Sequence, residues 1–394
     1  MSAEGPASAP AGGGGSAAVG GAASAGDKAS AGGSAATPAG GGGRGTARRG
    51  VFGGARRAAR AWVSFWDRRE HPASLALVRI FVAATIAADY AQVAALGLVG
   101  VLWAPAAEGG LSAARPGAPL CQAFAWFGPS AATARAVFGV ALASALCLGV
   151  GLFSRASALV LLLASAQLGH ILPDGDRGID TLLRNALVVL CLSPAGETWS
   201  VDARRRRGAW SAPAGLLAPA WPRYLLVAQL VVLYFSAGAQ KLSSPWSAAG
   251  GYSALYYLLN HPHYATFDFR WTGRVYPLTQ FGTFMTLLFE QSAPLVPLAL
   301  YYRATRERPG RLRRLFNRSR FFAAWVFTGA AFHLLLAVTM NLGIFPWGVL
   351  ALYPALFAPR EIMAFLSRAR RPLGPRARAD AGGPAGPAAS TPLT

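Results

Sequence analysis

Long apolar stretches, almost free of charged residues, alternate with blocks of arginine along most of this chain. The 394 residues are 53% hydrophobic and only 13% charged, whereas a soluble domain carries about a quarter charged residues. The mean hydropathy is +0.35. Apolar stretches long enough to cross the hydrocarbon core of a bilayer are typical of transmembrane helices. The sequence therefore predicts an all-α, polytopic integral membrane helical bundle; the alternative is a large soluble Ala/Leu-rich bundle.

Eight stretches have the hydropathy expected of transmembrane helices. They cover about 74–98, 131–153, 156–172, 179–194, 223–241, 275–300, 319–341 and 344–359. Two other stretches, 52–66 and 250–260, carry Trp and Tyr residues and are expected to form amphipathic or interfacial helices at headgroup depth.

The arginine blocks predict the orientation. If the N-terminus is cytoplasmic, most of the 37 Lys and Arg residues fall in segments on the cytoplasmic side, as the positive-inside rule requires. We therefore expect eight spans with both termini in the cytoplasm. The net charge of +21 then reflects topology and contact with anionic headgroups, and it does not indicate nucleic acid.

Composition divides the chain into four parts. Residues 1–48 are rich in Gly, Ala and Ser and are expected to be a disordered tail. Residues 49–70 form a basic amphipathic or interfacial segment, 71–371 the transmembrane domain, and 372–394 a second disordered tail. The abundance of Ala, Gly and Arg suggests a bacterial source of high genomic GC content, and hence a plasma (inner) membrane location.

Polar residues inside spans are costly and usually face a bundle interior or a cavity. Several fall near the predicted outer half of this bundle, among them the lone lysine in LYFSAGAQKLSSPW. The candidates are Arg79, Asp89, Asp180, Arg184, Lys241, Glu290 and His333.

Structural interpretations compete with functional ones at each position. Lys241 can simply extend to the outer interface, and His333 can be a hydrogen-bonded core histidine. Asp180 and Arg184 have the i, i+4 spacing of an ion pair within one helix. Arg79 and Asp89 are ten residues apart and are poorly placed to pair with each other.

Several kinds of chemistry lack their motifs. The sequence contains no GxSxG, no HExxH and no CxxC, and its three cysteines are scattered. We expect no metal site. Neither hydrolase, metalloprotease nor dinucleotide chemistry is supported.

Several motifs, in order, resemble the HTTM (horizontally transferred transmembrane) family, whose domain is shared with vitamin K-dependent γ-glutamyl carboxylase. They are HPASLALVRIFVAATIAADY, GLFSRAS, SPAGETWSVDA, LYFSAGAQKLSSPW with GGYSALYYL, and FHLLLAVTMNLGIFPW. The resemblance covers about residues 71–360.

The resemblance implies roles for two residues. Lys241 matches the second lysine of the carboxylase motif Gly-x-Lys-Lys-Leu, the proposed base that deprotonates vitamin K hydroquinone, while Gln240 replaces the first lysine. His333 matches the histidine of a Phe-His motif. A further carboxylase histidine falls near Asp180 and is not retained, and the large luminal domain has no counterpart after the bundle.

The resemblance favours an enzyme in which Lys241 deprotonates a quinol-like cofactor (vitamin K or menaquinol) at the outer leaflet. Desolvation makes an ammonium group lose its proton more easily, so such a lysine can act as a base. His333 would hydrogen-bond the oxyanion, and Asp180 or Glu290 would tune the lysine. The alternative is a non-catalytic membrane scaffold or lipid-binding protein on the same fold. The expected partners are membrane lipids and a lipid-soluble cofactor, with no nucleic acid; the sequence indicates no particular protein partner.

Overall fold

The computed structural model describes residue 56 and residues 59–60, 62–112 and 122–369. The two predicted tails and much of the stretch 52–66 lie outside the described residues. All described residues except Arg56 belong to one compact unit, Ala59–Thr394.

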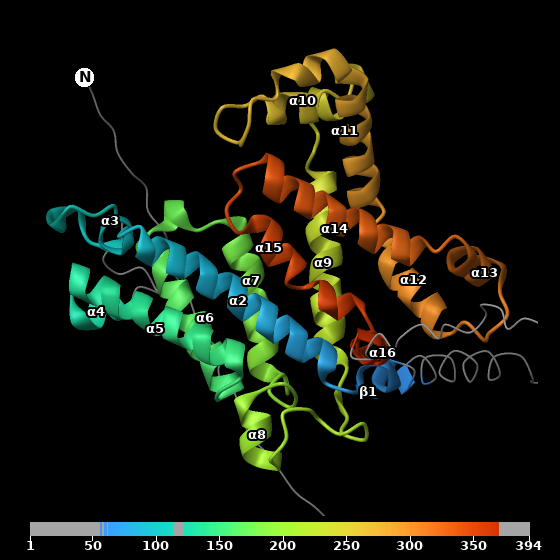
Figure 1. The fold of residues 1–394 in the computed structure, drawn as a ribbon, viewed down its shortest axis with the longest axis horizontal. Coiled ribbons are helices and arrows are strands. Elements are labelled where there is room, and N and C mark those ends of the chain that lie inside the picture. The colour runs from blue at the N-terminus through green and yellow to red at the C-terminus, as the bar shows by residue number, and fades with distance from the viewer. Residues whose placement is uncertain (1–55, 57–58, 61, 113–121, 370–394) are drawn as a thin grey trace, which may run out of the picture. The chain divides into compact units, whose positions relative to one another are not determined.

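The described part of this unit is built from helices (Figure 1). The longer ones are α2 (Ala73–Ala95), α5 (Ala131–Val150), α6 (Ser154–Ile171), α7 (Gly178–Leu192), α9 (Trp221–Ala239), α11 (Tyr276–Gln291), α12 (Leu295–Ala304), α14 (Phe321–Thr339) and α16 (Pro359–Ala369). The shorter ones are α3 (Val99–Trp103), α4 (Gln122–Phe127), α8 (Val201–Arg207), α10 (Ala254–Leu259), α13 (Arg311–Arg318) and α15 (Phe345–Leu350). Six 3₁₀ turns cover Ala106–Glu108, Pro173–Gly175, Ser244–Trp246, Ala248–Gly250, Arg270–Val275 and Tyr353–Leu356. Two short strands, β1 (Arg69–Glu70) and β2 (Ala218–Pro219), pair antiparallel.

Each of the eight predicted spans contains a helix, but not all of these helices are long and apolar enough to cross a membrane. Within the described residues, α2, α5, α9 and α14 meet that test. Two bent pairs raise the number to six: Arg270–Gln291 with Leu295–Ala304, at 61°, and Phe345–Leu356 with Pro359–Arg368, at 100°. Because α6 and α7 are not among them, the count of eight stays a prediction.

Proline and glycine set several of the breaks. Pro294 is the N-cap of α12, three residues after α11 ends at Gln291, and a proline favours a helix start over a continuing helix. Gly151 ends α5 with a φ of 73°, a left-handed conformation that glycine adopts readily. The carboxylate of Asp202 then accepts hydrogen bonds from the backbone N–H groups of Phe153 and Ser154, both at 2.8 Å, and so fixes the turn into α6.

The strand pair defines one end of the bundle, because it joins the segments that lead into α2 and α9. At the same end, Arg223 of α9 forms an ion pair with Glu70, at 2.7 Å, and Arg303 of α12 pairs with Glu361 of α16. We call this the basic end. The C-terminal ends of α2 and α9 lie at the other, distal end.

The outer faces of the bundle remain strongly apolar. Phe327 on α14 is 75% exposed, Leu335 on the same helix 59%, and Leu146 on α5 56%. Exposed apolar surface of this extent is unusual for a soluble monomer, whereas lipid-facing helices require it.

At the distal end, α10 and the N-terminal half of α11 project beyond α9 and α14 (Figure 1). The two are held together by Thr283, whose hydroxyl accepts from the N–H of Leu255 at 3.0 Å, and by Gln280, which donates to the carbonyl of Gly251 at 2.6 Å.

Candidate functional site

Lys241 lies just beyond α9 and forms an ion pair with Glu290, in the last turn of α11. Its Nζ is 2.7 Å from both carboxylate oxygens and donates weakly to the carbonyl of Ala237, at 3.3 Å. The ammonium also lies 5.0 Å from the ring centre of Trp246, within the range of a cation–π contact. The Glu290 side chain is only 5% exposed and that of Lys241 is 19% exposed, so the amine is the member that can be reached from outside.

A glycine allows the two helices to approach closely at this pair. A Cβ on Gly238 would lie 2.9 Å from the Cβ of Glu290 and 3.0 Å from Nε2 of Gln291. Such distances leave no room for any larger residue. The glycine of the Gly-Ala-Gln-Lys-Leu motif therefore helps to set the position of the carboxylate that meets the lysine.

His333 belongs to a second group, built around Tyr234. The Tyr234 hydroxyl is 2.7 Å from Nε2 of His333 and 2.7 Å from the hydroxyl of Tyr353, and all three residues are buried. The other ring nitrogen of His333, Nδ1, is buried with no hydrogen-bond partner among the described residues. A buried nitrogen without a partner is costly, so this atom is a point at which a polar ligand atom or a water could bind.

The two groups are neighbours along the same pair of helices. Tyr234, on α9, precedes Lys241 by seven residues, close to the length of two helical turns, although the helix itself ends at Ala239. Phe289 directly precedes Glu290 on α11. The rings of Tyr234 and Phe289 pack edge to face with centroids 4.8 Å apart. Within the described chain no direct hydrogen bond joins Lys241 to His333.

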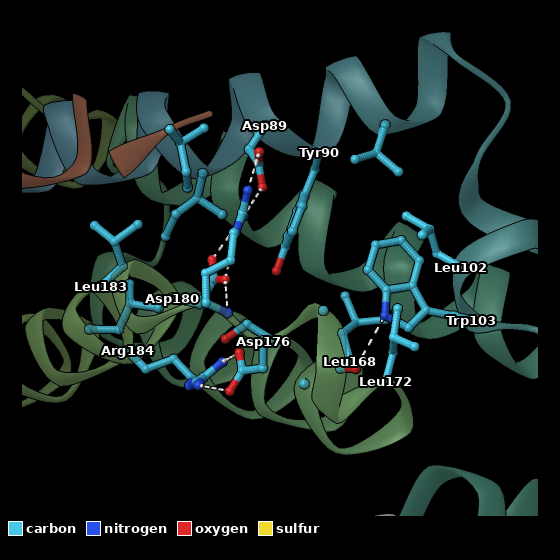
Figure 2. Close-up of a pocket in the computed structure, with 18 residues that line it drawn as sticks. Asp89, Tyr90, Leu102, Trp103, Leu168, Leu172, Asp176, Asp180, Leu183 and Arg184 are labelled. Carbon is cyan, nitrogen blue, oxygen red and sulfur yellow. Dashed lines mark hydrogen bonds and ion pairs between the residues drawn. The ribbon is translucent and has the colours of Figure 1, made fainter. Parts of the chain in front are cut away.

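The ends of α2 and α6 and the start of α7 enclose a cavity of about 180 Å³ at the distal end. Tyr90, Trp103, Leu168 and Leu172 line one side of it (Figure 2). The charged residues of its lining gather on another side, which we call its rim: Asp89, Asp176, Arg177, Asp180 and Arg184. The cavity therefore combines a mostly apolar lining with one charged group.

The rim brings together Asp89 and Asp180, but through a residue that the sequence patterns did not single out. Arg177 is 2.7 Å from the Asp89 carboxylate and 2.9 Å from that of Asp180. Although burial opposes the charge of Arg177, hydrogen bonds to Asp180 and Asp89 outweigh it and hold the pKa of Arg177 above its usual range.

Asp180 and Arg184, whose spacing allowed an ion pair within one helix, do not form one. Arg184 instead forms a two-pronged ion pair with Asp176, at 2.6 and 2.8 Å. The i, i+4 spacing permits a pair on a helix surface. Here Asp180 reaches back to the backbone N–H of Arg177, at 2.9 Å, and caps the start of α7.

Arg79 has a structural place, towards the basic end and away from the other candidates. It is fully buried and donates to the backbone carbonyls of Ala195 and Trp199, at 3.1 and 2.5 Å. These carbonyls belong to the turn after α7, in the SPAGETW motif. As expected, Arg79 does not pair with Asp89.

Five partners were missed by sequence reasoning: Arg177, Asp176, Tyr234, Trp246 and Tyr353. Tyr234 and Trp246 stand within the LYFSAGAQKLSSPW motif, and the seven-residue spacing from Tyr234 to Lys241 could have indicated a shared helix face. Neither spacing nor hydropathy identifies Tyr353, which reaches Tyr234 only through tertiary packing.

The long apolar helices and their exposed apolar side chains indicate a membrane protein. The HTTM domain model matches residues 67–308. The chain belongs to this family, which confirms the resemblance seen in its motifs. No curated protein and no solved structure matches the chain.

Proposed function

We propose that this chain is a membrane enzyme in which the Lys241–Glu290 pair takes a proton from a hydroxyl group of a lipid-soluble, quinol-like molecule. One observation carries the proposal: a buried carboxylate and a partly exposed ammonium lie 2.7 Å apart at the end of an apolar helix. Ionisable pairs at membrane depth are rare and usually functional.

The proposal includes an orientation. The basic end carries Arg68, Arg69, Arg223, Arg303 and Arg360, so the positive-inside rule favours its cytoplasmic placement. The distal end, with Lys241, then faces the outer leaflet of a plasma (inner) membrane. The molecule that meets the pair would enter from that leaflet.

The residues around Lys241 suit a ring that carries hydroxyl groups. The indole of Trp246 offers a flat apolar face beside the ammonium, and the exposed side chains of Phe235 and Leu242 offer apolar surface for an isoprenoid tail. The polar groups of the site are the amine of Lys241 and the carboxylate of Glu290. A quinol, when bound, supplies a hydroxyl that is acidic enough to be deprotonated and a ring that can then be oxidised.

The pair can accept one proton without leaving an isolated charge. Lys241 would pass one ammonium proton to a carboxylate oxygen of Glu290, 2.7 Å away. Its neutral amine, the member of the pair that can be reached from outside, would then accept the hydroxyl proton and become an ammonium again. This restored positive charge would face the oxygen that has lost its proton, and pre-positioned charge of this kind stabilises developing negative charge strongly in a low-dielectric site. The amine of Lys241 is also the acceptor that the family resemblance implies.

The test is quinol turnover in proteoliposomes containing the purified full chain. We expect Lys241→Ala and Glu290→Gln each to reduce turnover by about a hundredfold or more, the usual range for loss of general acid–base catalysis. Asp268→Asn is the matched control, because this carboxylate is 72% accessible and its contacts, with the backbone N–H of Arg270 at 3.0 Å and the Arg270 side chain at 3.8 Å, are local. Full activity in both pair variants would end the assignment.

A lipid-binding protein without catalysis is the second candidate, and the distal cavity favours it. Its rim charges largely neutralise one another in ion pairs, and its interior is apolar, so it is suited to hold an apolar chain. A quinone or lipid that co-purifies with the chain and is lost from a Leu168→Trp variant, with no turnover in the native chain, would support this candidate over the enzyme.

A further inference from the structure

A second cavity, of about 520 Å³, opens at the basic end between the segment 65–70, α9, α12 and α16. Five of the residues that line it are arginines, and only two are acidic. We call it the basic pocket. It lies at the opposite end of the bundle from Lys241 and is independent of the proposed chemistry there.

Ion pairs neutralise only two of the five arginines. Arg223 pairs with Glu70 through two hydrogen bonds, at 2.7 and 2.9 Å, and Arg303 pairs with Glu361. The other three arginines, Arg68, Arg69 and Arg360, are exposed and form no ion pair within the described residues. The pocket thus presents an excess of three positive charges, carried by exposed side chains, of which Arg68 lies 5.7 Å from the ring centre of Phe65.

An uncharged donor adds to this set. The indole N–H of Trp66, whose ring lines the pocket, is buried and has no hydrogen-bond partner among the described residues. Trp66 packs edge to face on Phe65, which itself stacks on Tyr224 with ring centroids 4.7 Å apart. These aromatic rings, typical of headgroup depth, fix one wall of the pocket.

Another part of the wall is apolar. It is lined by Val227 and Ala228 of α9 and by Pro297 and Leu300 of α12, and these helices belong to the predicted membrane-spanning part. A ligand in the basic pocket would therefore meet both arginines and hydrocarbon.

We propose that the basic pocket binds an anionic phospholipid, with its phosphate among Arg68, Arg69 and Arg360 and an acyl chain along α9 and α12. Guanidinium groups bind phosphate oxygens through paired hydrogen bonds, and basic pockets between spans are suited to acidic headgroups. A small soluble phosphate would use the arginines but not the apolar wall, so the shape of the pocket favours the lipid.

The experiment measures lipid retention by the full chain. The chain is reconstituted in nanodiscs of phosphatidylcholine with a minor fraction of phosphatidylglycerol of the same acyl chains, then released into mild detergent for native mass spectrometry. We expect one phosphatidylglycerol to remain per chain in preference to phosphatidylcholine. The variant Arg68→Gln/Arg69→Gln/Arg360→Gln should retain it roughly a hundredfold less, since the contributions of the three arginines near a headgroup add in free energy.

The matched control removes the same charge elsewhere. Arg311, Arg314 and Arg318 are also exposed but lie on α13, outside the pocket, so their replacement by Gln should leave retention unchanged. Equal loss in both triple variants would overturn the site in favour of general attraction to basic surface, as would undiminished retention in the pocket variant.

A further measurement keeps the outcome decisive. Displacement of the lipid by an excess of inorganic phosphate would overturn the lipid assignment and indicate a soluble phosphate instead.

Discussion

Loss of the lysine from the Lys241–Glu290 pair is the most informative perturbation of stability. Lys241→Met keeps the length and apolar stem of the side chain but removes its charge. It leaves the Glu290 carboxylate, 5% exposed, without the ammonium that now lies 2.7 Å from both of its oxygens. An unpaired buried charge is strongly unfavourable.

The expected magnitude depends on this burial. Breaking a buried ion pair by removing one partner costs about 3–5 kcal/mol, and because Lys241 is 19% exposed the lower half of this range applies, about 3–4 kcal/mol. Replacing both members by apolar residues, in Lys241→Met/Glu290→Leu, removes the uncompensated charge. The double variant should therefore be close to the native chain, within about 1–2 kcal/mol.

The assay is reversible unfolding of the purified chain in detergent micelles, followed by helical circular dichroism, for the native chain, both single variants and the double variant. The exposed pair Arg270–Asp268, whose side chains are 90% and 72% accessible, is the control, and its removal should cost less than about 1 kcal/mol. If the costs of the two single substitutions simply add in the double variant, the two side chains are not energetically coupled and the reasoning is refuted.

Three other perturbations test separate parts of the structure. Tyr234→Phe removes the hydroxyl shared by two buried polar partners and should cost about 1–3 kcal/mol, seen in the same unfolding assay; an unchanged stability would contradict that network. Gly238→Val should lower both stability and quinol turnover, because its Cβ would meet that of Glu290 at 2.9 Å, whereas a fully stable and active variant would show that α9 and α11 can separate freely. Burial raises the pKa of Asp202, but hydrogen bonds from Ser154 and its neighbour outweigh it, so the pKa lies below its ordinary value. The ionised Asp202 carboxylate therefore stabilises the fold at neutral pH, and this contribution is lost as the pH falls below about 4. In Asp202→Asn, the free energy of unfolding measured against pH should decrease less steeply over this acid range.

Hydropathy located the helices well because an apolar stretch of about twenty residues matches the thickness of the hydrocarbon core and is typical of a transmembrane helix. Hydropathy could not separate membrane-spanning helices from short helices packed inside the bundle. The apolar composition of α7 predicts a span, but this helix is only 15 residues long. Hydropathy also predicted one helix over 275–300, whereas the structure has two helical segments there that meet at an angle of 61°.

At the candidate site, sequence reasoning found side chains but not all of their partners. Lys241 and Glu290 stood out because a charge in an apolar run is costly wherever it occurs, and both prove to be one pair. Asp180 and Arg184 were misassigned because spacing along a helix shows only neighbours on that helix. The competing partners, Arg177 and Asp176, come from the loop before α7, and their positions depend on how α2, α6 and α7 pack.

The projection formed by α10 and α11 has a consequence for how the whole bundle sits in lipid. It and the loop that follows α10 expose aromatic side chains, with Tyr257 60%, Phe267 58% and Trp271 55% accessible, and such rings settle where hydrocarbon meets headgroups. We therefore expect the projection to help set the depth at which the protein lies in the bilayer. The hydration of the amine at the end of α9 would then depend partly on aromatic side chains that belong to other segments of the chain.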